Sequence, residues 1–182
     1  MNAVDVVRRL HEHRMWANHQ LLAAAGKLSP ETLRQTFAIG QGSIWKSLLH
    51  LYAAEYVWIE ALQGNQSAIT PGDVPGKLPG NQEAPGAIES LEQLEADWRA
   101  LDARWQSYLA NLRAESLEDS VIRVSSTGKT FAARRVDSLL HVCTHASYTV
   151  AQVVNMLRQS GAESFPDIML ISLARQQMLA DR

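Results

Sequence analysis

The most regular feature of the sequence is an apolar repeat in residues 91–112, where large apolar side chains recur at alternating spacings of three and four. Such spacing places them along one stripe of an α-helix that packs against nearly parallel helices. Three heptads are short for an intermolecular coiled coil, so we expect the partner helices to come from the same chain. The aromatic members of the stripe are then core residues rather than the walls of a cofactor site. They are Trp98, Trp105 and Tyr108.

Three further segments combine helical apolar spacing with a comparable length: residues 3–25, 43–62 and 136–158. Gly26 is placed to end the first of them. Ser43 and Asp137 are the candidate N-caps of the second and third. The second segment is the most apolar, which is typical of a helix in the middle of a bundle. The pattern therefore predicts an all-α protein built on a four-helix bundle, with residues 1–182 as a single domain.

Shorter elements are expected between these helices. A short helix should begin at Pro30, a β-hairpin with a turn at Gly128 should precede the last long helix, and a final helix should run from Phe165 to about Met178. Residues 64–86 contain four of the six prolines and five of the ten glycines. We expect this segment to be a long irregular crossover between helices.

Composition excludes several classes of function. The formal net charge of −2, without a cluster of Lys and Arg, gives no reason to expect nucleic-acid binding. The single cysteine, Cys143, cannot form an intrachain disulfide, which suits a reducing cytoplasm. No apolar run has the length of a membrane span, and charged residues interrupt any signal-like pattern near the N-terminus. We expect a cytoplasmic protein that does not bind membranes.

Histidines are the candidate functional residues. His141 and His145 are four residues apart, so on a helix they share one face and form a natural half-site for a metal ion. The pair alone is a weak motif. His50 lies in the apolar second helix and, taken alone, is more typical of a hydrogen-bonded core histidine than of a ligand. Cys143 points away from both histidines of the pair, so we expect a buried small residue and not a nucleophile.

The three N-terminal histidines are expected to be exposed or satisfied at the surface: His11, His13 and His19.

Several runs together resemble the DinB family, which includes YfiT-like metal-dependent hydrolases and proteins related to DNA-damage-inducible DinB. The runs are Met15-Trp16-Ala17-Asn18, Leu28-Ser29-Pro30-Glu31, Gly42-Ser43-Ile44, Leu49-His50-Leu51, Glu55-Tyr56-Val57-Trp58, His141-Val142-Cys143-Thr144-His145 and Val153-Val154-Asn155-Met156-Leu157-Arg158. The resemblance covers nearly the whole chain. It implies an up-down-down-up bundle, in which the proline-rich segment is the long crossover.

The resemblance also implies a divalent metal ion, often Zn or Ni. One histidine of the second long helix (residues 43–62) and two of the fourth (residues 136–158) would hold it. His50 and His145 match two of these ligands, whereas Thr149 stands where the family usually has the third. Threonine is a poor ligand for such an ion. His141 is the candidate replacement, because it lies on the same helix face. Three alternatives stay open: a three-histidine site that includes His141, a weak or empty site of His50 and His145, or another set of ligands.

Two classes of function follow from the resemblance. The first is a metal-dependent enzyme, either a hydrolase or an S-transferase that uses a low-molecular-weight thiol such as bacillithiol or mycothiol. Glu55 would then orient His50 or act as a base, with an exposed helix glutamate as the alternative, and Tyr148 and Gln152 would line the pocket beside Thr149. The second class is a metal-free, non-catalytic bundle that binds a small ligand or serves as a dimeric scaffold. Family members are often homodimers, so a homodimer is expected.

Overall fold

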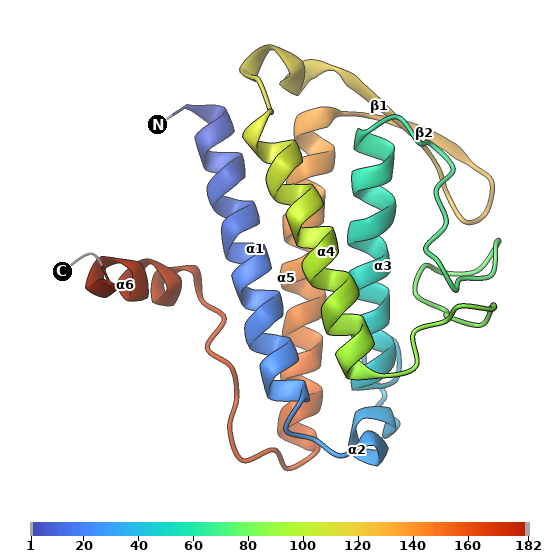
Figure 1. Ribbon diagram of the computed structural model, residues 1–182, viewed down its shortest axis with the longest axis vertical. Helices are drawn as coiled ribbons and strands as arrows, with labels where there is room; N and C mark the ends of the chain where they lie inside the picture. The colour runs from blue at the N-terminus through green and yellow to red at the C-terminus, as the bar shows by residue number, and fades with distance from the viewer. Residues whose placement is uncertain (1, 181–182) are drawn as a thin grey trace.

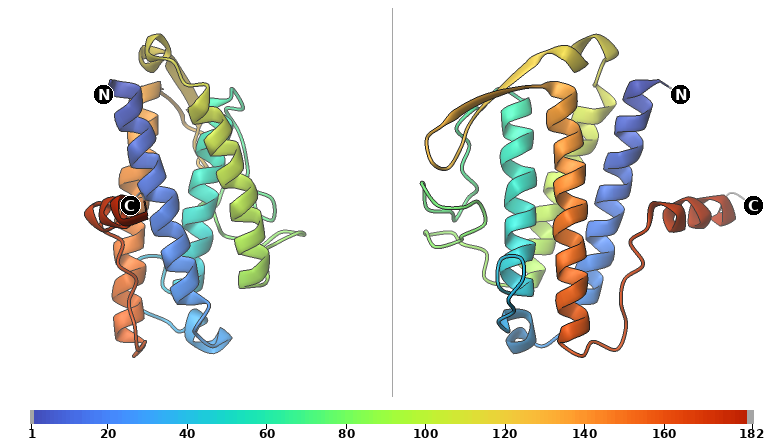
Figure 2. Two further views of the ribbon diagram at one scale, coloured as in Figure 1. Left: turned by 60° about the vertical axis from the view of Figure 1, so that its left-hand side comes forward. Right: turned by 180° about the vertical axis from the view of Figure 1, so that it is seen from behind.

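The computed structural model describes residues 2–180, and four long helices lie side by side in it (Figures 1 and 2). These are α1 (Ala3–Ala25), α3 (Ile44–Leu62), α4 (Leu91–Ala110) and α5 (Arg135–Gln159). The smaller elements are α2 (Pro30–Arg34), a 3-10 helix (Ala114–Glu118), the antiparallel strands β1 (Ser120–Val124) and β2 (Thr130–Arg134), and α6 (Leu170–Ala180). The predicted helical protein with one small hairpin is confirmed. No helix in residues 2–180 has the length and apolarity needed to cross a membrane.

The N-caps show how the sequence defines most helix starts. The side chain of Ser43 accepts a hydrogen bond from the backbone N–H of Lys46, and Ser90 accepts one from Gln93 in the same way. The predicted cap at Asp137 is wrong. Strand β2 runs directly into α5, so that the N-cap residue is Arg134, and Asp137 lies in the first helical turn, where it pairs with the Arg134 side chain.

Helix α6 begins at Leu170, later than the expected start at Phe165. The carboxylate of Asp167 explains the shift. It accepts hydrogen bonds from the backbone N–H of Met169 and from the hydroxyl of Ser172, which fixes the entry to the helix at this point.

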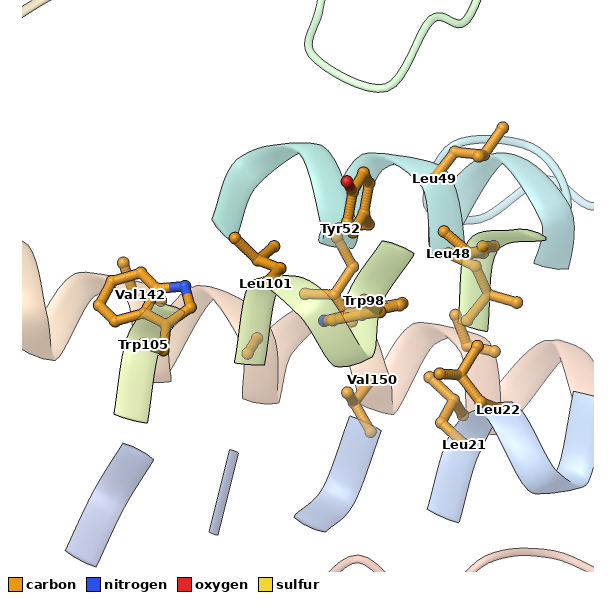
Figure 3. Packing of buried hydrophobic residues seen from close by; sticks show 14 of the residues in the cluster. Leu21, Leu22, Leu48, Leu49, Tyr52, Trp98, Leu101, Trp105, Val142 and Val150 are labelled. Carbon is orange, nitrogen blue, oxygen red and sulfur yellow. The ribbon is translucent and has the colours of Figure 1, made fainter. Parts of the chain in front are cut away.

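The core is one continuous apolar cluster to which all four long helices contribute (Figure 3). Trp98 and Trp105 of α4 are fully buried in it, together with Leu21 of α1 and Leu48 of α3. The regular apolar stripe of residues 91–112 therefore faces the core, as predicted. Burial of this kind stabilises the fold by about 25 cal/mol for each Å² of apolar surface removed from water.

The crossover between α3 and α4 and the β1–β2 hairpin lie on the same side of the helices (Figure 1). A backbone hydrogen bond of 2.8 Å from Val124 to Gln66 joins them. The crossover also lies directly on α3, because a Cβ atom built on Gly80 would come within 2.5 Å of the backbone of His50. The crossover therefore helps to position the predicted site.

Candidate metal centre

His50 projects from the middle of α3 and is half-buried. Its Nδ1 lies 2.8 Å from the carbonyl oxygen of Pro79 in the crossover. A carbonyl oxygen only accepts, so Nδ1 carries the hydrogen, and in the corresponding imidazole tautomer the lone pair is on Nε2. This is the arrangement by which proteins orient a histidine that ligates metal through Nε2.

His145 of α5 meets His50 across the boundary between the two helices. The two Nε2 atoms are 3.3 Å apart, and the ring planes are inclined at 71°. Two nitrogens that bind one tetrahedral ion at about 2.0–2.1 Å are separated by about 3.3–3.4 Å. The observed separation therefore fits two ligands of a common ion.

The protonation state of His145 suits the same role. Burial lowers its pKa to about 4, helped by the nearby rings of His50 and His141. The ring is therefore neutral near pH 7, and a neutral imidazole is the form that binds metal.

His141 lies one turn before His145, and the centres of the two rings are 5.8 Å apart. It is exposed on one side and packs on the other against Trp58, whose ring centre is 5.1 Å away. The guanidinium of Arg123 lies 5.0 Å from the centre of the Trp58 ring. Burial against this stack, followed by the charge of Arg123, lowers the pKa of His141.

The third ligand position is not filled in this arrangement. Within residues 2–180, no three side chains of His, Cys, Asp or Glu are grouped so as to hold a metal ion. Thr149, which follows His145 by one turn, is buried and offers only a neutral hydroxyl. The residues present thus fit a metal ion as a two-imidazole half-site, with His141 beside it but turned toward Trp58.

The other two predicted pocket residues, Tyr148 and Gln152, differ in exposure. Tyr148 is 69% exposed. Gln152 is half-buried against the loop before α3, where its Oε1 would lie 2.8 Å from a Cβ atom built on Gly40.

Glu55 is 1% exposed, so the alternative of an exposed glutamate is wrong. Its carboxylate accepts hydrogen bonds from Asn18 Nδ2 (2.7 Å) and Trp98 Nε1 (3.1 Å) and forms an ion pair with Arg14. These partners belong to α1 and α4 in the protein interior, and His50 is not among them. The geometry gives Glu55 a structural role.

Sequence reasoning missed the two α1 partners of this carboxylate. Arg14 and Asn18 are both buried. Arg14 occupies a position in the apolar stripe of the first helix, and a charged residue in such a stripe was the available signal.

His11 corrects another expectation, because it is fully buried and not at the surface. Its Nε2 lies 3.1 Å from the carbonyl oxygen of Leu139, and burial holds its pKa well below the usual value. Cys143 is buried as predicted. Burial raises the pKa of its thiol to about 12, which opposes a role as nucleophile.

Comparison with known proteins agrees with the helical fold. No curated protein matches the sequence. A sequence model of the DinB family matches residues 1–177 of the 182-residue chain. Because this match spans nearly the whole length, including the helices of His50 and His145, the chain belongs to the DinB family.

Proposed function

We propose that this protein is a metal-dependent enzyme of the DinB type that holds a divalent ion, Zn or Ni, between α3 and α5. One observation carries the proposal: the Nε2 atoms of His50 and His145 are 3.3 Å apart, and the bond to Pro79 leaves the His50 lone pair free. This geometry suits two ligands of one ion.

The third ligand in this proposal is His141. Catalytic zinc sites usually have three protein ligands and one open position. A rotation of the His141 ring away from Trp58 brings an imidazole toward His145 from the preceding turn of the same helix. Such a rotation needs no backbone change, because the ring is exposed on its outer side.

The proposed reaction is hydrolysis or the transfer of a low-molecular-weight thiol to a small electrophilic substrate. A bound divalent ion supplies a Lewis acid that lowers the pKa of a water or thiol. The chain itself contributes orientation: Pro79 fixes the ring of His50, and burial keeps His145 neutral. The partly buried cation of Arg123, stacked on Trp58, would favour an anionic substrate or thiolate near His141.

The arrangement of the long helices belongs to the same proposal. We assign α1, α3, α4 and α5 to the up-down-down-up bundle of the DinB family, which accords with their directions in Figure 1. A homodimer is part of the proposal, and nucleic acid and membranes are not among its partners.

A second candidate is a metal-free bundle that binds a small ligand or acts as a dimeric scaffold. It is favoured by the neutral hydroxyl of Thr149 at the usual ligand position and by the lack of a three-ligand group within residues 2–180. Under this alternative, the His50–His145 contact is a hydrogen bond, with His145 donating to His50.

Metal analysis of tag-free protein, loaded with Zn or Ni and then desalted, separates the two candidates. The enzyme proposal expects about one ion per chain, and much weaker binding in His50→Gln and His145→Gln. His141→Ala should also weaken binding if that ring is the third ligand, whereas the control His13→Gln should not. A wild-type content below about a tenth of an ion per chain would instead support the metal-free bundle.

A further inference from the structure

A cavity of about 380 Å³ lies between α1, α5 and residues 168–170, on a face of α5 different from that of His145. Its walls are mostly apolar and include Ala17, Ala146, Val150 and Ile168. One wall is fastened by a hydrogen bond, since Nε2 of His13 lies 2.7 Å from the carbonyl oxygen of Ile168 and donates to it. Ligand sites typically enclose about 300–1,000 Å³, so this cavity suits a small molecule.

Two buried polar side chains also line this cavity. Arg14 is 2% exposed and Asn18 is 1% exposed. Within residues 2–180, Nε and Nη2 of Arg14 have no hydrogen-bond partner, and neither has Oδ1 of Asn18. Buried polar atoms in native proteins are nearly always paired, so these atoms indicate a missing polar partner.

The neighbouring groups define the orientation of both side chains. The carboxylate of Glu55 already has three partners: Arg14, Asn18 Nδ2 and Trp98 Nε1. Because the amide nitrogen of Asn18 faces this carboxylate, its oxygen remains available for a donor. Arg14, which also stacks on Trp105, has N–H groups left for an acceptor.

Charge balance then selects the ligand. Glu55 neutralises Arg14, so a ligand carboxylate would leave a second buried negative charge without a partner. A hydroxyl or a primary amide both accepts and donates hydrogen bonds and carries no charge. The apolar walls favour a hydrocarbon or aromatic body for the rest of the molecule.

We propose that this cavity is a second ligand site, for a small neutral molecule with an apolar body and one hydroxyl or amide group held by Arg14 and Asn18. The site is independent of the histidine pair and requires no metal.

Three probes of similar size test this site: p-cresol, toluene and benzoate. They are titrated against metal-free, full-length protein in EDTA, with NMR detection of the methyl groups of Ala17 and Ala146. We expect saturable shifts with p-cresol and an affinity about tenfold higher than for toluene, which lacks the hydroxyl. Benzoate should bind at least about tenfold more weakly than p-cresol, because of its unbalanced charge.

Variants locate the binding. Ala151 and Ser147 line the mouth of the cavity at exposed positions of α5, so Ala151→Phe and Ser147→Phe should block the entry and abolish the p-cresol shifts without unfolding the protein. The matched control is Ala100→Phe, at an exposed position of α4 away from the cavity.

Three outcomes overturn the proposal: no saturable shift with p-cresol, equal affinity for toluene, or binding unaffected by both blocking variants. None of these outcomes bears on metal binding at His50 and His145.

Discussion

Thr149 is the residue at which this chain departs from the usual ligand pattern of its family. It lies one helical turn after His145 on the same face of α5, so replacing it with histidine places a third imidazole beside the His50–His145 pair. We expect Thr149→His to bind Zn at least about tenfold more tightly than the wild type.

The measurement is the free energy of unfolding with and without Zn, because binding to the folded state adds about 2.7 kcal/mol at a ligand concentration of 100 Kd. A larger side chain at a buried position destabilises the metal-free protein, and this comparison removes that effect. Thr127→His, in the exposed hairpin turn, is the control. Equal stabilisation of variant and wild type by Zn would contradict the expected geometry.

His19 gives a pH-dependent prediction away from the proposed metal centre. Its Nε2 lies 2.9 Å from Oδ2 of the buried Asp102, and this contact raises the pKa of His19 above its usual value. The folded state therefore binds the proton more tightly than the unfolded state does. The resulting stabilisation is complete below the unfolded pKa of about 6.5 and is lost as the pH rises through the folded pKa.

The effect is small, about 0.5–1 kcal/mol, because the side chain of His19 is 42% exposed and solvent screens the pair. It is measured as the difference in unfolding free energy between wild type and His19→Gln, from pH 5 to pH 9. That difference cancels the contributions of His11, His141 and His145, whose pKa values are lowered. A wild-type advantage that is constant across this pH range would show that the pair does not titrate as described.

At the scale of single residues, the sequence predicted which residues belong to the candidate site better than it predicted which groups they contact. His50 was a candidate through the family resemblance, whereas its bond to Pro79 depends on the path of an irregular crossover that no periodicity describes. The environment of Glu55 was mispredicted for a related reason. Its partners Arg14 and Trp98 are 41 and 43 residues away, and local spacing does not show which helices face each other.

At the scale of the structural elements, the crossover between α3 and α4 depends on one close contact, between Gly80 and the backbone of His50. Gly80 has a φ of +85°, and an added Cβ would lie 2.5 Å from backbone atoms of His50. We expect Gly80→Ala to push the crossover off α3, break the His50–Pro79 hydrogen bond and lower the free energy of unfolding by about 3 kcal/mol.

Gly76→Ala and Gly86→Ala are matched controls in the same crossover. Both glycines have a positive φ, but an added Cβ would meet no atom within 4 Å. In each control, the free energy of unfolding should fall by only about 1–2 kcal/mol, which is the cost of placing alanine in a left-handed backbone conformation. Urea unfolding of all three variants makes the comparison, and a loss in Gly80→Ala no greater than in the controls would contradict the close approach.

The long helices were predictable because their apolar spacing extends over several turns and their caps are local. Ser43 caps its helix as expected, and Ser90 caps α4 in the same way, each through a contact within three residues. The start of α5 was not predictable in the same way. There, hydrogen bonding in the hairpin carries β2 to Arg134, and the helix follows at once, so tertiary structure overrides the local preference of Asp137 for a cap.

At the scale of the whole molecule, the fold separates two kinds of interior. The apolar cluster unites all four long helices, while the polar group around Glu55 links α1, α3 and α4. The histidine pair lies at the boundary of α3 and α5, and the cavity that we propose as a second ligand site lies between α1 and α5. Helix α5 therefore carries both proposed sites on different faces: His145 meets α3, whereas Ala146 and Val150 line the cavity beside α1.

Because the core is one cluster, the four long helices should unfold together. Three of the five tryptophans, Trp45, Trp98 and Trp105, belong to this cluster, so tryptophan fluorescence reports mainly on the core while far-UV circular dichroism reports on the helices. We expect the two signals to give superimposable urea curves with one midpoint, as in a two-state transition. Leu101→Ala, which removes a buried side chain next to both tryptophans in α4, should move both midpoints to lower urea by the same amount, with a loss of about 2–5 kcal/mol. The exposed Ala103→Gly on the same helix is the control and should lose only about 1 kcal/mol. Separate fluorescence and circular dichroism midpoints would show that some of the helices unfold on their own, and the single core would then be the wrong description of this molecule.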